Sequence, residues 1–67
     1  MSRSFKSSRK AAVAVLNSDI GLSEKAYSFL GQLVATNPDE LSRRQAAWLD
    51  DLLEEAGLPA HRVKVRR

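Results

Sequence analysis

The stretch LSRRQAAWLDDLLEEAGLP, from Leu41 to Pro59, decides most of what the sequence says about the fold. Its Ser-Arg-Arg-Gln start has the spacing of a capping box, in which Ser42 accepts from the amide three residues on and Gln45 reaches back. Gly57 suits the left-handed position after a helix, and Pro59 prevents continuation. The pattern therefore predicts a helix between Ser42 and Gly57.

The apolar residues of this stretch recur at helical spacing and define a predicted core face. That face is expected to hold Gln45, Trp48, Leu49, Leu52, Leu53 and Ala56. The opposite face carries two cations and then four carboxylates: Arg43, Arg44, Asp50, Asp51, Glu54 and Glu55. This order of charges opposes the helix dipole at a small energetic cost per exposed charge, so the acidic face is a candidate binding surface.

Two more helices are expected before this stretch. Ser23 is a good N-cap, and Asn37-Pro38 ends a helix because a residue before proline avoids the helical region. The core side of that helix is predicted to hold Ala26, Tyr27, Phe29, Leu30, Leu33 and Val34. A first helix runs from a serine cap at 7 or 8 to about residue 16 or 17, with core residues Ala12, Val13, Val15 and Leu16. The second and third helices share the offsets of their apolar pairs, which suggests antiparallel packing of the two.

The predicted fold class is all-α, a compact bundle of about three helices with basic terminal arms. The predicted organisation is a basic N-terminal arm at 1–6, a helical domain at 7–58 and a basic C-terminal tail at 59–67. AVAVL at 12–16 and RVKVR at 62–66 also alternate like strands. The alternative is therefore α+β, with a short two-stranded sheet from 11–16 and 62–66, and the tail is otherwise an extended or disordered arm.

Length and composition exclude several kinds of function. A chain of 67 residues forms one domain at most, and its thin core makes a homodimer a candidate assembly. There is no cysteine, which fits a reducing cytoplasm, and a single histidine, His61, which we expect to be solvated. We find no glycine-rich phosphate loop and no poised acid–base pair, so we expect no enzyme activity, no cofactor and no bound metal. The longest apolar run, Ala11–Leu16, is too short to span a membrane, and we expect no secretory signal and a cytoplasmic location.

The charge is concentrated at the two ends of the chain. Residues 1–10 and 61–67 carry four cations each, and the residues between them carry a net charge of −5, which gives the total of +3. Basic arms bind polyanions, and arginines at the start of a helix can contact bases. The predicted nucleic-acid-binding residues are Arg3, Lys6, Arg9, Lys10, Arg43, Arg44, Arg62, Lys64, Arg66 and Arg67. The alternative is protein binding through the acidic residues Asp50, Asp51, Glu54 and Glu55, a stripe that the chain's own basic tail would otherwise cover.

The segment FLGQLVATNPDELSRRQAAWLDDLLEEAG resembles a pattern met in small accessory proteins of phages and mobile elements. In that pattern an aromatic-leucine helix precedes a Leu-Ser-x-x-Gln helix that contains Trp-Leu or a similar pair. The resemblance covers about half of the chain and implies a phage-like setting. Such proteins bind DNA or act as inhibitors of a host machine, including CRISPR nucleoprotein complexes (anti-CRISPR proteins). The expected function is therefore that of a small accessory protein that binds a nucleic acid or nucleoprotein complex, and the alternative is an inhibitor or adaptor that binds a host protein.

Overall fold

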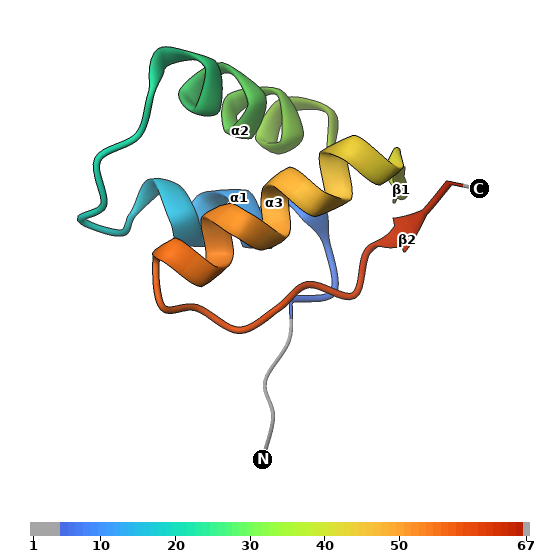
Figure 1. The fold of residues 1–67 in the computed structure, drawn as a ribbon. Helices are drawn as coiled ribbons and strands as arrows, with labels where there is room; N and C mark the ends of the chain where they lie inside the picture. The colour runs from blue at the N-terminus through green and yellow to red at the C-terminus, as the bar shows by residue number, and fades with distance from the viewer. Residues whose placement is uncertain (1–4, 67) are drawn as a thin grey trace.

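Between residues 5 and 66, which the computed structural model describes, three helices surround a small core and two very short strands pair (Figure 1). In chain order the elements are α1 (Ser8–Leu16), α2 (Glu24–Thr36), β1 (Glu40–Leu41), α3 (Arg43–Glu55) and β2 (Lys64–Val65). The structure is thus mostly helical, with a two-stranded sheet. The strand that the alternative fold placed at 11–16 is wrong, because those residues belong to α1.

The third helix begins and ends where its sequence predicts. The Ser42 hydroxyl accepts from the Gln45 amide at 3.2 Å, and the Gln45 side chain accepts from the Ser42 amide at 2.9 Å, which completes the capping box. At the other end Gly57 has φ of 69°, and the amide of Leu58 donates to the carbonyl of Leu53 at 2.9 Å. Together with the bond from the Gly57 amide to the Glu54 carbonyl, at 3.0 Å, this forms a Schellman arrangement that satisfies carbonyls of the last turn.

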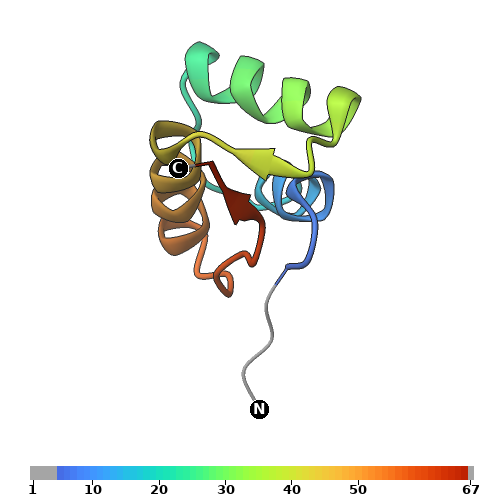
Figure 2. The same cartoon turned by 90° about the vertical axis from the view of Figure 1, so that its right-hand side faces the viewer.

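The central helix is α1, which packs against both other helices. Its inward side consists of small residues, and Ala11, Ala12 and Val15 are all fully buried. Short side chains let the neighbouring helices approach α1 closely. Figure 2 shows α2 and α3 crossing instead of running side by side, so their predicted antiparallel packing is wrong. One contact between the two helices is a pair of stacked rings, Phe29 and Trp48.

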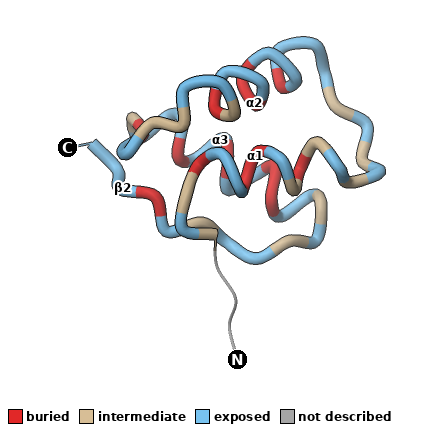
Figure 3. The backbone as a smooth tube through the Cα atoms, turned by 180° about the vertical axis from the view of Figure 1, so that it is seen from behind, coloured by how far each residue is buried: buried red, intermediate tan, exposed pale blue. Residues whose placement is uncertain are grey.

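The core lies where the three helices, β1 and the tail converge (Figure 3). Its buried apolar residues are Ala11, Ala12, Val15, Ala26, Phe29, Leu30, Leu33, Leu41, Ala46, Leu49, Leu52, Leu53 and Val63. Four residues predicted to be in the core are exposed instead: Val13, Tyr27, Gln45 and Trp48. On α3 the buried position next to Gln45 belongs to Ala46.

The ends of α1 and α2 are tied together by side chains. Asn37 takes the left-handed conformation with φ of 42° and ends α2 at the predicted place, although not in the extended conformation usual before proline. Its Oδ1 accepts from the Arg9 amide at 3.3 Å, and the Arg9 Nε donates to the Val34 carbonyl at 2.9 Å. The buried Ser8 hydroxyl donates to the Pro38 carbonyl at 3.1 Å. These bonds fix the start of α1 against the end of α2.

Both terminal segments lie along the same side of the molecule. The Phe5 amide donates to the Ala60 carbonyl at 3.0 Å, and the Arg62 amide donates to the Phe5 carbonyl at 2.7 Å. Further on, β2 pairs in parallel with β1, and Val63, directly before β2, is buried. A parallel pair needs a long crossover, which α3 provides here. The tail therefore joins a sheet with residues 40–41, not with residues 11–16.

Candidate nucleic-acid interface

Basic residues from two distant parts of the chain line one open cleft beside the β1–β2 pair. This basic cleft has a volume of about 760 Å³ and is lined by Glu40, Arg43, Lys64, Val65 and Arg66. The strand register sets its composition, because Glu40 lies opposite Lys64 and Leu41 lies opposite Val65. The tail cations therefore stand next to the first residue of α3. Of the predicted basic residues, Arg43 of the third helix and Lys64 and Arg66 of the tail are brought together here.

The cations of the basic cleft are accessible to a ligand. Arg66 Nε lies 3.1 Å from Glu40 Oε1, but the two side chains are 71% and 43% exposed. Such a solvated ion pair contributes at most about 1 kcal/mol, so a phosphate can compete for the guanidinium. Arg43 and Lys64 are exposed, and neither forms an ion pair within residues 5–66. The cleft thus presents three cations against one carboxylate.

A buried histidine anchors the tail to α3. The prediction of a solvated His61 is wrong: its side chain is only 4% exposed. Its Nδ1 accepts from the Val63 amide at 3.2 Å, so the ring proton belongs on Nε2, which lies 3.1 Å from Asp50 Oδ1 and 3.3 Å from the Ala46 carbonyl. Both ring nitrogens are therefore occupied within the protein. His61 holds the tail in place and thereby positions the cations that follow it.

The remaining predicted basic residues are spread over other surfaces. Arg9 donates to the Val34 carbonyl at the end of α2, where a cation also interacts favourably with the helix dipole, so part of its function is structural. Lys6, Lys10 and Arg62 are exposed. The structure does not place these four in the basic cleft. Arg3 and Arg67 lie outside the described residues.

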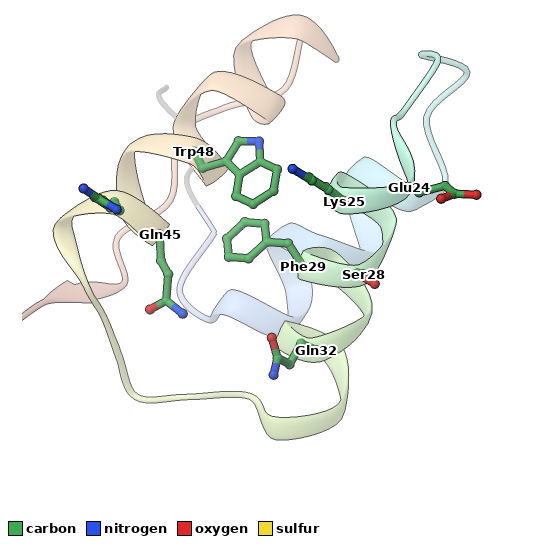
Figure 4. A pocket seen from close by; sticks show the side chains of 8 residues that line it. Glu24, Lys25, Ser28, Phe29, Gln32, Gln45 and Trp48 are labelled. Carbon is green, nitrogen blue, oxygen red and sulfur yellow. The ribbon is translucent and has the colours of Figure 1, made fainter.

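A second cleft, of about 630 Å³, opens between α2 and α3 around the stacked rings (Figure 4). We call it the aromatic cleft, and its lining residues are Glu24, Lys25, Ser28, Phe29, Gln32, Arg44, Gln45 and Trp48. The ring centroids of Phe29 and Trp48 are 4.6 Å apart and their planes differ by 7°. Phe29 is 7% exposed, whereas Trp48 is 38% exposed. The inner ring therefore supports an accessible indole.

The sequence assigned both of these rings to the core and missed the aromatic cleft. Helical periodicity places Phe29 and Trp48 beside the leucines, but it does not show that α2 and α3 cross. No sequence pattern points to Lys25 as a site residue. Gln32 and Gln45 are exposed and form part of the polar rim of this cleft. Their polar side chains are the signal of the cleft in the sequence.

The acidic face of α3 is only partly available. Asp50 is paired with His61, whereas Arg66 of the tail pairs with Glu40 and not with an acid of α3. Asp51 and Glu55 line a third cleft, of about 350 Å³, on another side of Trp48. Its other lining residues are Gly21, Leu22, Ser23, Ala26 and Leu52. Glu54 is exposed on the same helix.

Within residues 5–66, no three metal-ligating side chains come together in a way that would hold a metal ion. Over the same residues, no helix has both the length and the apolar character that a membrane crossing needs. No protein-family model, no curated protein and no solved structure matches this chain.

Proposed function

We propose that this protein is a small non-enzymatic accessory protein that binds a nucleic acid or a nucleoprotein complex. The observation that carries the proposal is the basic cleft, in which Arg43 from α3 meets Lys64 and Arg66 from the tail. In sequence, Arg43 is separated from Lys64 and Arg66 by the rest of α3 and the segment that follows it, so the three residues come together only in the fold. Clustered exposed cations neutralise neighbouring phosphates and release counterions, which is the main source of nucleic-acid affinity.

The position of the cluster adds a second argument. Arg43 is the first residue of α3, where the unpaired amides and the helix dipole also favour an anion. The acids at 50, 51, 54 and 55 begin two turns further along the same helix, so a phosphate chain at the β1–β2 pair does not have to cross them. The cations at the start of α3 oppose the helix dipole. The proposed function explains this order of charges, because it places the cations at the end of the helix that binds anions.

The test is binding to labelled single- and double-stranded DNA and RNA, titrated across salt. We expect affinity to fall steeply with salt, and the triple variant Arg43→Gln, Lys64→Gln, Arg66→Gln to lower the slope of log K against log salt by about 2–3. The matched control is the charge-conserving pair Arg43→Lys and Lys64→Arg, which should keep the slope. Absence of binding to all four nucleic acids at low salt would refute the proposal.

The second candidate is an inhibitor or adaptor that binds a host protein through the acidic face of α3. The observation that favours it is the third cleft, where Asp51 and Glu55 flank the exposed Trp48. Aromatic residues beside complementary charges are frequent hot spots of protein interfaces. In this case the charge reversals Asp51→Lys and Glu55→Lys abolish partner binding, while the triple basic-cleft variant leaves it unchanged. A phage setting and a CRISPR-type target, which the resemblance implies, belong to this candidate as much as to the first.

A further inference from the structure

We infer that the aromatic cleft receives an unpaired base of a single-stranded nucleic acid. This inference rests on the proposed function and deepens it, because it names the strand state that the protein prefers. The basic cleft alone would bind single strands and duplexes through their phosphates. The aromatic cleft adds a contact that only an unstacked base can make.

The stacked rings form a rigid platform. Trp48 is 38% exposed although it adjoins the core, and Phe29 lies parallel to it at 4.6 Å on the buried side. The support of Phe29 limits the motion of the indole before any ligand arrives, so little side-chain entropy is lost on binding. Bases stack on such aromatic side chains regardless of sequence, and this contact is a main source of single-strand affinity. A paired base inside a duplex cannot reach the cleft without being unstacked.

The polar rim of the cleft matches the edge of a base. Gln32 on α2 and Gln45 on α3 lie below the rings on opposite sides of the cleft in Figure 4. The Gln45 Oε1 is held by the Ser42 amide at 2.9 Å, which fixes the side chain and leaves its NH₂ group free to donate. The Gln32 side chain makes no hydrogen bond within the described residues, so both the carbonyl oxygen and the NH₂ group of its amide are available. Glutamine pairs bidentately with adenine, which predicts a preference for adenine.

The charges around the rings favour a phosphate chain. Lys25 on α2 and Arg44 on α3 line the cleft from opposite helices, against the single carboxylate of Glu24. Figure 4 shows the Lys25 side chain directed toward Trp48. Both cations are exposed and form no ion pair within residues 5–66. A negatively charged ligand with a flat ring is therefore a better match than a neutral or basic peptide.

A groove lies next to both clefts. It has a volume of about 320 Å³, shares Gln32 and Gln45 with the aromatic cleft, and shares Glu40 and Arg66 with the basic cleft. One strand can therefore lay phosphates on the tail cations and place a base against Trp48. Beyond Trp48 the third cleft carries Asp51 and Glu55, which repel phosphates and end the path there.

Tryptophan fluorescence tests this inference directly, because Trp48 is the only tryptophan of the chain. The intact protein is titrated with oligodeoxyadenylate, with oligoriboadenylate and with a DNA duplex at one salt concentration. We expect both single strands to quench Trp48 and the duplex to leave its emission unchanged. The comparison of the DNA and RNA strands shows which sugar the site prefers.

Variants separate this contact from the phosphate contacts. Trp48→Leu and Gln32→Ala are expected to weaken single-strand binding, by about tenfold for the tryptophan, and to leave duplex binding unchanged. Tyr27→Ala is the matched control, because Tyr27 is an exposed aromatic of α2 that does not line the cleft. Circular dichroism verifies the fold of each variant, and quenching of the unmodified protein gives an answer even if Trp48→Leu unfolds.

Two results would overturn the inference while leaving the proposed function intact. One is equal affinity for single strands and duplex with constant Trp48 emission. The other is single-strand binding that needs Arg43 and Lys64 but is indifferent to Trp48→Leu and Gln32→Ala. Failure to bind any nucleic acid would instead refute the proposed function itself.

Discussion

Replacing His61 with alanine is expected to lower the free energy of unfolding by about 2–3 kcal/mol. The hydrogen bond from the Val63 amide to Nδ1, at 3.2 Å, contributes about 1 kcal/mol. The contact of Nε2 with Asp50, at 3.1 Å, adds about 1 kcal/mol at most, because that carboxylate is 54% exposed and screened by water. Loss of an imidazole that is 4% exposed removes roughly another 1 kcal/mol of buried contact.

Urea unfolding followed by Trp48 fluorescence measures this change. Native domains have free energies of unfolding of about 5 kcal/mol or more, which exceeds the expected loss. The variant should therefore stay folded, with a clearly lower urea midpoint. Arg62→Ala, on the exposed neighbour of His61, is the control and should stay within about 0.5 kcal/mol of the original protein. Equal effects of the two substitutions would refute the view that His61 anchors the tail. If the anchor is real, His61→Ala also weakens nucleic-acid binding, since it frees the segment that carries Lys64 and Arg66.

Four further substitutions test the local structure, each by the same urea unfolding. Gly31→Ala should raise the free energy of unfolding by about 1 kcal/mol, because Gly31 lies inside α2 and an added Cβ meets nothing within 4 Å. Gly57→Ala should lower it by about 1 kcal/mol, because φ of 69° strains any side chain, and equal signs for the two glycines would contradict the helix boundaries. Ser42→Ala should cost about 1 kcal/mol through loss of the capping box, and an unchanged midpoint would show that the cap is dispensable. Leu49→Ala should cost about 2–5 kcal/mol, since Leu49 is fully buried, and a loss below 1 kcal/mol would place it outside the core.

The helices could be predicted because their ends are encoded locally. Ser23 and Ser42 cap the helices that follow them, and Asn37 and Gly57 take the left-handed conformation just after the helices end. Each signal depends on residues within one turn of each other, so no knowledge of the rest of the fold is needed. The apolar stripes were predicted less well, because a periodic pattern gives the centre of a buried face and not its width. Tyr27 and Trp48 belong to the predicted core faces but are exposed.

The features that form the candidate site were decided by the tertiary structure. Pairing of Glu40–Leu41 with Lys64–Val65 joins residues more than twenty positions apart, and a two-residue strand leaves almost no periodicity to detect. The burial of His61 depends on where α3 places Asp50 and the Ala46 carbonyl, neither of which is near it in sequence. The aromatic cleft lies between α2 and α3, which both pack against the small buried residues of α1 and leave Trp48 partly exposed. Which segments are helical and which residues carry charge can be read from the sequence, since these properties follow from local chemistry. Which charges and rings meet depends on the packing of distant segments, and that packing is visible only in the fold.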